Sequence, residues 1–548
     1  MSIETNRNRT NGNHRKVALP RSGQTNTFPL GHGELTHFDL ERAKSNRAAD
    51  RPLRVMKFGG TSVGDANCIA MVVDIIRESF LNADLIVVVS AMSGVTNKLV
   101  EAAMQAEAGN AEQVAQILKE LRLQHVVALT SLSLPSEEQQ RISKRMEELF
   151  EGLERLCKGT SSLGELTPRV RDAVSSLGER LCAPLVAAAL QQAGVASQAV
   201  DSTQLVITDS CHGAADPWID LTRERCEIEL LPLVRNRVVP IVTGFIGSTS
   251  EGVVTTLGRG GSDYSAAIIS AATSADEVEI WTDVDGILTA DPRLIPGACT
   301  IAEISYREAA ELAYFGAKVL HPKTLRPLAQ SGIPLWIRNT FAPEKPGTKI
   351  TPEGSRGTDG VTALTAVSDA SLINIGGPGV ASVPDLLGRA VATTRELRTD
   401  VLLISQSSSQ HDIFLVVPAS MANQTVEHLR REFAEDLAYE QVQNITIDST
   451  VAVITVVGKN MRGIPGIVGR TFCALGRSNI DPIAIAHGAS ESNISFVVAR
   501  EHAQAALAAV HCEFRLGAAT GPLSPEELIS QSSQGMRHNC DSCVASAD

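Results

Sequence analysis

Two glycine-rich segments of the sequence carry side chains that could bind and neutralise anions. The first is Lys57-Phe58-Gly59-Gly60-Thr61-Ser62, at the end of a short apolar stretch. Glycines let backbone N–H groups approach an anion closely, and a lysine supplies a compact positive charge for phosphate oxygens. The lysine precedes the glycines, which is not the order of the usual P-loop. The alternative interpretation is a tight turn between a strand and a helix, with a surface lysine.

The second glycine-rich segment is TTLGRGGSDYSAA at residues 255–267. Arg259 could hold a carboxylate through two parallel hydrogen bonds, and Asp263 could hold a lysine in place. In the simpler interpretation, Ser262 or Asp263 only caps the helix that follows. Two such loops in one α/β domain are hard to attribute to turns alone, so they favour an anion-binding site.

Three further segments carry polar residues whose role depends on where the fold places them. WTDVDGILTADPR at 281–293 follows a predicted strand, and polar groups at the carboxyl end of a strand commonly line a nucleotide crevice. Its aspartates fit no calcium-loop spacing, so no metal site is predicted. FGAKVLHP at 315–322 places Lys318 at a helix end, where the helix dipole alone would favour it. Glu179-Arg180 is either a surface pair or part of the cleft.

These segments are positioned by alternating strands and helices. Strands are predicted at 55–58, 85–89, 238–245 and 277–281, and helices at 97–156, 262–272 and 306–315. This alternation indicates a layered α/β domain with a mainly parallel central sheet. Several Pro and Gly residues between 343 and 354 then mark a linker.

An internal repeat follows the linker. A shift of 81 residues aligns 383–417 with 464–498 without a gap and gives nine identities, among them Pro384 with Pro465 and Asp400 with Asp481. Each copy is predicted to run strand, helix, strand, strand, which is the order of a ferredoxin-like βαββαβ unit. Two such units commonly pair, so that each buries a face of the other.

Composition excludes several classes of protein. The 548 residues include 49 Lys and Arg against 62 Asp and Glu, a formal charge of −13, which argues against nucleic acid or an anionic membrane as a partner. The apolar runs are shorter than a membrane helix needs. The ten cysteines follow no disulfide framework. We therefore expect a cytoplasmic protein.

The two ends of the sequence are polar. Residues 1–51 are predicted to be a disordered extension, with a transit peptide as the alternative. Residues 519–548 are predicted to be a disordered tail. The tail contains Cys540-x-x-Cys543 and His538, a weak signal for a metal or redox site because a fourth ligand or a folded helix start is missing.

Taken together, the motifs resemble those of the aspartokinases. The segments that carry the resemblance are KFGGTSV at 57–63, SAMSGVTN at 90–97, GER at 178–180, TTLGRGGSDYSAA at 255–267, WTDVDGI at 281–287, TADPR at 289–293 and FGAKVLHP at 315–322. The repeat, with LISQSSS at 403–409, resembles the paired regulatory ACT domains of the same family. Its regulatory half is most similar to that of threonine-sensitive aspartokinases fused to homoserine dehydrogenase. No room remains for a dehydrogenase, so a monofunctional enzyme is expected.

The resemblance implies an α/β fold. A three-layer amino-acid-kinase domain with a mainly parallel central sheet is expected at 52–341. Two ferredoxin-like βαββαβ ACT domains are expected to follow, the first with its linker at 342–446 and the second at 447–518.

The resemblance also implies a reaction, the transfer of a phosphoryl group from ATP with Mg²⁺ to the side-chain carboxylate of L-aspartate. The nucleophile is already an anion, so catalysis should depend on positioning and charge neutralisation. The implied catalytic residues are Lys57, which neutralises the phosphoryl group, Asp263, which orients Lys57, and Lys318. The implied substrate-binding residues are Ser90, Thr96, Glu179 for the ammonium group, Arg259 for the α-carboxylate, and Ser262.

The implied ATP-binding residues lie in several of these segments. They are Lys57, Phe58, Gly59, Gly60, Thr282, Asp283, Leu288, Arg293, Lys318 and Val319. Gly59 and Gly60 are expected to offer backbone donors. Leu288 stands where family members often have a tyrosine, which predicts altered nucleotide affinity rather than lost activity.

The resemblance further implies an amino-acid effector, lysine or threonine, bound between ACT domains that assemble a homodimer or homotetramer. The expected effector contacts are Ile404, Gln406, Ile485 and His487. His487 stands where threonine-sensitive relatives usually have glutamine, which leaves the effector open and could add pH dependence.

Two alternatives belong to other functional classes. One is a catalytically silent amino-acid sensor, against which the full set of charged motif residues argues. The other is a kinase of the same fold that acts on acetylglutamate or carbamate, whose known members lack the paired regulatory units and the GER segment.

Overall fold

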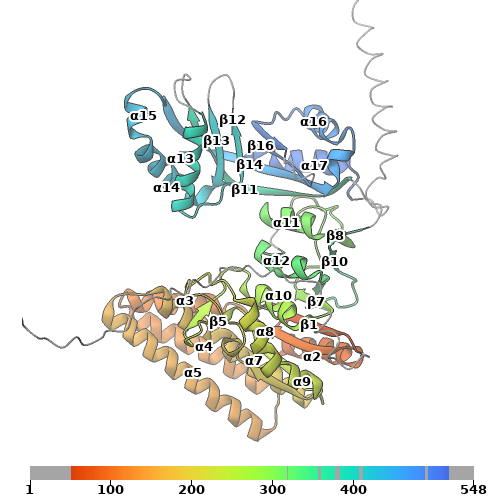
Figure 1. Ribbon diagram of the computed structural model, residues 1–548. Coiled ribbons are helices and arrows are strands. Elements are labelled where there is room, and N and C mark those ends of the chain that lie inside the picture. Colours follow the sequence, from red (N-terminus) through yellow and green to blue (C-terminus); the bar gives the residue numbers. More distant parts are fainter. Residues whose placement is uncertain are drawn as a thin grey trace, which may run out of the picture.

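The computed structural model describes residues 51–316, 319–355, 360–376, 383–406, 412–487 and 492–517 (Figure 1). The predicted tail with its Cys540-x-x-Cys543 motif, almost all of the predicted N-terminal extension, and Lys318 lie outside the described residues.

The N-terminal domain is built on an eight-stranded sheet. Its first six strands run parallel, and β10 is antiparallel to β9 but parallel to β8. In spatial order the strands are β3 (Ser197–Val200), β4 (Val239–Thr243), β2 (Asp84–Val89), β1 (Leu53–Phe58), β7 (Glu277–Thr282), β9 (Leu335–Asn339), β10 (Thr348–Thr351) and β8 (Glu303–Ser305). The central strands are buried on both faces, which explains their continuous apolar sequences.

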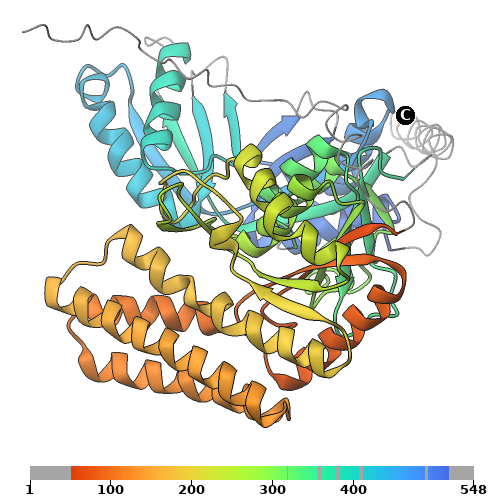
Figure 2. The same ribbon diagram turned by 60° about the horizontal axis from the view of Figure 1, so that its bottom comes forward.

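Helices cover both faces of this sheet (Figures 1 and 2). One face carries α2 (Ala66–Asn82), α6 (Pro168–Ser175) and α7 (Leu177–Gln192), together with α3 (Val95–Glu107), α4 (Ala111–Ser131) and α5 (Ser136–Leu163). The other face carries α8 (Ile219–Glu229), α9 (Leu231–Arg235), α10 (Gly261–Thr273), α11 (Tyr306–Tyr314) and α12 (Pro322–Ser331). A small hairpin, β5 (Ile246–Ser248) with β6 (Val254–Thr256), and a short helix η1 (Ser202–Gln204) lie beside them.

The long helical stretch predicted at 97–156 is three helices, α3, α4 and α5. The breaks fall at Gly109-Asn110, where Gly109 has a φ of 76°, and at the turn before Pro135. Glycine accepts this left-handed conformation without steric strain, and proline favours the first turn of a helix or the position before it. The three helices pack on one another and extend the layer beyond the edge of the sheet (Figure 2).

The C-terminal domain is a six-stranded antiparallel sheet. In spatial order its strands are β12 (Leu403–Gln406), β13 (Ile413–Pro418), β11 (Gly360–Gly376), β14 (Asn444–Lys459), β16 (Asn493–Ala499) and β15 (Ala484–His487). Its helices are α13 (Val383–Glu396), α14 (Ala419–Glu432), α15 (Ala434–Ala438), α16 (Ile467–Arg477) and α17 (Ala503–Glu513), with short turns η2 (Met461–Gly463) and η3 (Arg500–His502).

The two ferredoxin-like units of this sheet interleave along the chain. Residues 370–376 of β11 pair with β13 and with the first half of β14, which completes the first unit. Residues 360–367 of β11 pair with 453–459 of β14, next to β16. The fourth strand of the second unit is therefore supplied by residues that precede the first unit. The predicted boundary between the two ACT domains, at residues 446 and 447, follows the repeat in the sequence. In the sheet, however, residues 360–367 belong to the second unit.

Strands β11 and β14 change register on both sides of Ala370, and also between Val361 and Ala363. Each unit has its own apolar core beneath its helices. A further core, which includes Leu372 and Leu403 from the first unit and Val453 and Val497 from the second, lies between the two units. The units therefore bury the inner faces of their strands against each other, as the repeat predicted.

The second unit touches the loop that follows β7. Thr289 in this loop lies with its hydroxyl 3.1 Å from Nε2 of His511 on α17, and its carbonyl accepts a hydrogen bond from the backbone N–H of Leu364 on β11. On the other side of the contact, Asn493 donates to the Glu311 carboxylate on α11 at 2.5 Å. Figure 1 shows α11 between the C-terminal sheet and the rest of the N-terminal domain.

Candidate active site

A cleft of about 530 Å³ lies at the carboxyl ends of β1, β2 and β7. In parallel sheets, this edge is where ligands bind. The lining residues include Lys57, Gly59, Gly60, Thr61, Ser90, Ala91, Met92, Ser93, Gly94, Thr96, Asn97, Glu179, Phe245, Gly258, Gly260, Gly261, Ser262, Asp263, Thr282, Asp283 and Val319. The cleft thus unites seven segments that are separated in the sequence.

An ion pair between Lys57 and Asp263 lies in the cleft. Lys57 Nζ is 2.5 Å from Asp263 Oδ1, and the two side chains are only 9% and 15% exposed. The β1 strand carries Lys57 to the carboxyl edge, and the first turn of α10 supplies Asp263. A β-carbon on Gly59 would stand 3.5 Å from Lys57 Nζ. The absence of a side chain at Gly59 therefore leaves the ammonium group open towards the cleft.

The N-termini of two 13-residue helices, α3 and α10, border the same cleft. Each follows a glycine in the left-handed conformation, Gly94 with a φ of 77° and Gly260 with a φ of 69°. The unpaired N–H groups and the macrodipole make such helix ends favourable for anions. A β-carbon on Gly260 would stand 2.8 Å from the β-carbon of His321, so this turn admits no larger residue.

Glu179 faces the cleft from the first turn of α7. Gly178 lets the helix approach the loop after β2, because a β-carbon there would stand 2.6 Å from that of Ala91. The Ala91 backbone N–H donates to Glu179 Oε1 at 3.2 Å, while the buried Oε2 accepts no hydrogen bond from the described residues. Burial raises the pKa of Glu179 to about 8, opposed by its own and the Ala91 backbone N–H and by the charge of Lys57.

Most of the predicted substrate and nucleotide residues line the cleft. Besides Lys57, Asp263 and Glu179, they are Gly59, Gly60, Ser90, Thr96, Ser262, Thr282, Asp283 and Val319. Arg259 stands between the lining residues Gly258 and Gly260, but its side chain is exposed and does not line the cleft. Its backbone is therefore at the site, and a rotation of its side chain would be needed to reach a ligand.

The glycine turn differs from the prediction in two details. The Gly59 N–H donates to the Trp281 carbonyl at 3.1 Å, because the pairing of β1 with β7 continues one residue beyond the strand. Gly59 is thus not a free donor for an anion in this structure. Phe58 is fully buried and stacks on Trp281 with ring centroids 6.0 Å apart, so its side chain belongs to the core.

Two predicted nucleotide residues lie outside the cleft. Leu288 is half-buried and pairs through its backbone with Thr300. Arg293 is exposed and forms an ion pair with Asp291, at 2.6 Å between Nη2 and Oδ2. Neither lines the cleft, and their predicted contact with a nucleotide remains a prediction.

Several lining residues were not singled out as site residues from the sequence. Met92, Ser93 and Asn97 lie in the SAMSGVTN segment, so the segment was found but its members were not distinguished. Phe245 gave no signal, since it ends an apolar strand. It has a φ of 68°, which is unusual for a bulky residue. The backbone N–H of Phe245 donates a hydrogen bond to Ser265 Oγ at 2.9 Å, which stabilises this conformation.

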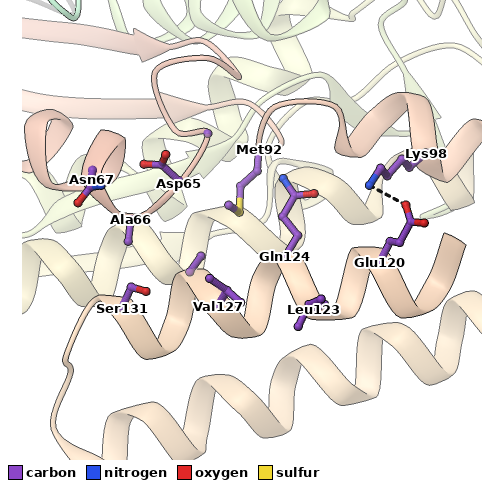
Figure 3. Close-up of a pocket in the computed structure, with 12 residues that line it drawn as sticks. Asp65, Ala66, Asn67, Met92, Lys98, Glu120, Leu123, Gln124, Val127 and Ser131 are labelled. Carbon is purple, nitrogen blue, oxygen red and sulfur yellow. Dashed lines mark hydrogen bonds and ion pairs between the residues drawn. The ribbon is translucent and has the colours of Figure 1, made fainter. Parts of the chain in front are cut away.

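The loop after β2 is held from behind by the helical layer (Figure 3). Gln124 of α4 donates to the Ser93 carbonyl at 3.1 Å, and Lys98 of α3 pairs with Glu120 of α4 at 3.0 Å. Met92 lines both the cleft and a groove of about 620 Å³ between these helices. The helical layer therefore braces the wall of the cleft.

The helical segment that carries Glu179 is also the one described segment long and apolar enough to cross a membrane. It spans Pro168–Gln192, and 78% of its most apolar part is buried inside the domain. That burial is typical of the core helix of a globular domain, which matches its packing against α2 and β4.

The predicted effector residues lie on the two edge strands of the C-terminal sheet. Ile404 and Gln406 are on β12, and Ile485 and His487 are on β15; all four are exposed. Strands β12 and β15 lie close to each other because the two units pack face to face. Two exposed isoleucines thus stand on neighbouring strands at one side of the domain.

Comparison with known proteins agrees with this architecture. Residues 52–339 match the amino acid kinase family, and 373–433 and 454–514 each match an ACT domain. The chain is 31% identical over 477 residues to aspartokinase 3, chloroplastic, of Arabidopsis thaliana, which covers 86% of this chain and 84% of that protein. The solved structure of E. coli aspartokinase III with aspartate and ADP (R-state) has a TM-score of 0.72 at 30% identity, covering 84% of this chain and 100% of that one.

The chain belongs to the aspartokinase family. The predicted family and the predicted fold class, an amino acid kinase domain followed by ACT domains, are confirmed.

Other relatives of this aspartokinase-family chain are longer. Bifunctional aspartokinase/homoserine dehydrogenase 1, chloroplastic, of Arabidopsis thaliana is 34% identical over 472 residues, which is 85% of this chain but 51% of that protein. The chain therefore spans about half the length of the bifunctional relatives that it matches. A second structure of E. coli aspartokinase III, with lysine and aspartate (T-state), has a TM-score of 0.70 at 30% identity.

Proposed function

We propose that this aspartokinase-family chain transfers the γ-phosphoryl group of ATP to the side-chain carboxylate of L-aspartate, giving 4-phospho-L-aspartate and ADP. The observation that supports this most is the convergence of the Lys57–Asp263 ion pair, Glu179 and two helix N-termini on one cleft. E. coli aspartokinase III, whose fold this chain shares, was solved with aspartate and ADP.

The chemistry needs charge neutralisation more than proton transfer. The attacking carboxylate is already an anion, so two negative groups must be brought together without a general base. Lys57 neutralises the negative charge of the phosphoryl group during its transfer, and Asp263 holds the Lys57 ammonium group in place. The N-terminus of α10 adds backbone donors that are already oriented and need no reorganisation during the reaction.

The substrate is selected by its two other charges. Glu179 accepts hydrogen bonds from the ammonium group of aspartate, for which its unpartnered Oε2 is available. Arg259 binds the α-carboxylate after its side chain turns into the cleft. Ser90, Thr96 and Ser262 line the remaining wall. An acid that lacks the ammonium group would leave the buried Glu179 carboxylate unpaired, which is a strong basis for rejection.

The nucleotide is proposed to bind beside β7. Thr282 ends this strand and Asp283 follows it, and both line the cleft with Val319. Mg²⁺ that accompanies ATP is bound mainly through phosphate oxygens and one or two carboxylates, and Asp283 is an exposed carboxylate in the right place. Among the described residues no group of three or more His, Cys, Asp or Glu could hold a metal.

The C-terminal units are proposed to bind an amino-acid effector, lysine or threonine, and to assemble a homodimer or homotetramer. E. coli aspartokinase III was solved with lysine in its T-state. In this chain Gln406 and His487 offer polar contacts on edge strands, beside Ile404 and Ile485, which are 42% and 45% exposed. Effector binding would reach the cleft through the contact between Thr289 and His511.

A coupled assay of ADP release tests the proposed reaction. The purified chain is supplied with MgATP and, in separate reactions, L-aspartate, L-glutamate or N-acetylglutamate. The proposal requires turnover with aspartate well above that with the other two acids. No turnover with any acid would instead support a catalytically silent sensor, and preference for N-acetylglutamate would support a different kinase of the same fold.

A further inference from the structure

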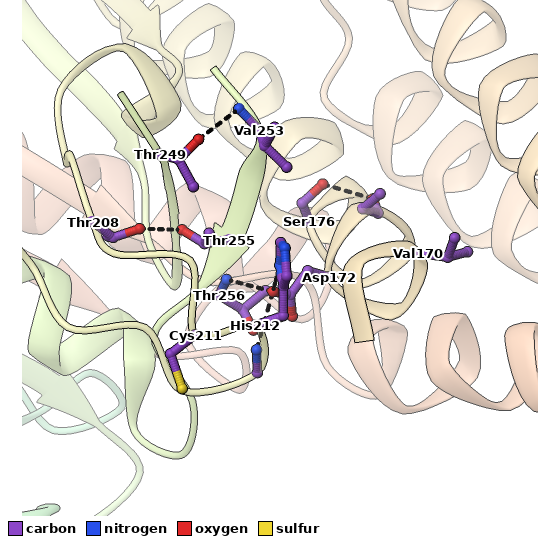
Figure 4. A network of polar contacts seen from close by, with 12 residues as sticks. Val170, Asp172, Ser176, Thr208, Cys211, His212, Thr249, Val253, Thr255 and Thr256 are labelled. Carbon is purple, nitrogen blue, oxygen red and sulfur yellow. Dashed lines mark hydrogen bonds and ion pairs between the residues drawn. The ribbon is translucent and has the colours of Figure 1, made fainter. Parts of the chain in front are cut away.

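A buried carboxylate outside the cleft connects the two parts of the proposed aspartate subsite. Asp172 lies on α6 and is 2% exposed. Figure 4 shows it where α6 meets the hairpin strand β6 and the loop that carries His212. None of the motifs discussed above includes Asp172.

The hydrogen bonds of Asp172 come from two separate segments. Thr256 donates twice, from its hydroxyl to Oδ1 at 2.6 Å and from its backbone N–H to Oδ2 at 3.2 Å. The backbone N–H of Gly213 and Nδ1 of His212 donate to Oδ2 at 3.0 and 2.8 Å. An ionised carboxylate only accepts hydrogen bonds, so the proton of the His212 ring lies on Nδ1. Asp172 is therefore a buried acceptor with all of its donors in place.

One side of this network leads to Arg259. Thr256 is the last residue of β6 and begins the glycine-rich loop. Further along this loop, a β-carbon on Gly258 would stand 3.1 Å from the Gly213 carbonyl. Asp172 thus fixes both the start of the loop, through Thr256, and the segment against which the loop rests, through Gly213.

The other side of the network leads to Glu179. Helix α6, which carries Asp172, passes directly into α7 at Ser176, whose backbone N–H donates to the Asp172 carbonyl at 2.9 Å. Glu179 lies in the first turn of α7. A displacement of α6 relative to β6 would therefore change the separation between Glu179 and the Arg259 loop.

We propose that Asp172 is a positioning residue that sets the selectivity for aspartate by holding the Glu179 helix and the Arg259 loop at a fixed separation. This inference rests on the proposed function of the cleft. Aspartate carries its ammonium group and its α-carboxylate on one carbon atom, so their receptors must keep that spacing. A misplacement of about 1 Å can lower a rate about a hundredfold. The nucleotide residues Thr282, which ends β7, and Asp283, which follows it, contribute none of the side-chain hydrogen bonds that Asp172 makes with the described residues.

The test compares Asp172→Asn with wild type in KM for aspartate, KM for ATP and the preference for aspartate over succinate, which lacks the ammonium group. Asparagine keeps the volume but offers an NH₂ group where four donors converge. We expect the KM for aspartate to rise roughly ten- to a hundredfold. The preference over succinate should shrink, and the KM for ATP should stay within about twofold.

A milder pair of variants covers the case in which Asp172→Asn does not fold. Thr256→Val removes one hydroxyl group from the network, and Thr256→Ser keeps it. Thr256→Val should raise the KM for aspartate, whereas Thr256→Ser should keep the KM of the wild type. Asp436→Asn is the matched control, because Asp436 is a buried carboxylate, 9% exposed and paired with Arg389, in the C-terminal domain. It should lower the melting temperature without changing the KM for aspartate.

The outcomes separate this inference from the proposed function. If wild type does not phosphorylate aspartate, the proposed function fails and this inference fails with it. If wild type is active but Asp172→Asn and Thr256→Val lower only the melting temperature, or change both KM values equally, Asp172 has a structural role alone and the inference is overturned.

Discussion

The pH dependence of aspartate use should report the ionisation of Glu179. In the empty cleft its pKa is raised to about 8, mainly by burial. The carboxylate must be ionised to hold the substrate ammonium group. About one tenth of the empty sites would therefore be competent at about pH 7, and about one hundredth at about pH 6. Each pH unit below the pKa costs about 1.4 kcal/mol of binding free energy.

The assay is a pH series of kcat/KM for aspartate with ATP saturating, since kcat/KM reports the pKa values of the free enzyme. We expect kcat/KM to rise about tenfold per pH unit from about pH 6 and to level off near pH 8. Glu179→Gln should lower kcat/KM and abolish this rise. The control is Glu279→Gln, since Glu279 is another buried acid whose pKa is raised by burial, but it lies in the sheet outside the cleft. That variant should keep the rise.

A profile that is flat below pH 8, or the same rise in Glu179→Gln, would refute the assignment of Glu179 to the ammonium group. Stability gives an independent check of the sign. A raised folded-state pKa means that the contribution of Glu179 to stability is complete below its unfolded value of about 4.5 and is lost as the pH rises through about 8. Glu179→Gln should therefore melt at a higher temperature than wild type at about pH 8.5 and lose this advantage towards about pH 5.

Three further variants test other parts of the molecule. Lys57→Ala should lower kcat by roughly a thousandfold or more while circular dichroism stays unchanged, and near-normal turnover would contradict its role. Arg259→Ala should mainly raise the KM for aspartate; a collapsed melting temperature with an unchanged KM would mean that it is structural. His125→Leu should reduce the loss of melting temperature on acidification. His125 is fully buried with a pKa lowered from 6.5 by burial, so its contribution to stability is present above 6.5 and lost below it. An equal loss in both proteins would contradict this.

Much of the fold and of the cleft could be predicted because short segments of the sequence determine it. The continuous apolar strands predicted a parallel sheet, and glycine-rich segments at strand ends predicted where its polar edge lies. The residues alone indicated that Asp263 could hold a lysine, and the resemblance to the aspartokinases implied that this lysine is Lys57; the two side chains lie 2.5 Å apart. The position of Glu179 could not be decided from its spacing alone. Whether a glutamate on a helix faces solvent or a cleft depends on which side of the helix packs on the sheet.

Features that depend on contacts between residues far apart in the sequence could not be predicted in this way. The Gly59 N–H is occupied by the Trp281 carbonyl because β1 and β7, far apart in sequence, are neighbours in the sheet. The placement of residues 360–367 in the second regulatory unit has the same cause, since each repeat looks complete by itself. The network around Asp172 joins three segments through four hydrogen bonds, and no spacing in the sequence indicates it.

The identity of the phosphorylated atom tests the proposed reaction most directly. The purified chain is incubated with MgATP, L-aspartate and hydroxylamine, which traps an acyl phosphate as a hydroxamate, and the product is compared with the synthetic α- and β-isomers by mass spectrometry. The cleft described above predicts the β-hydroxamate, formed in step with ADP and lost in Lys57→Ala. The α-isomer, or ADP release without any hydroxamate, would contradict the placement of the aspartate side chain beside Lys57.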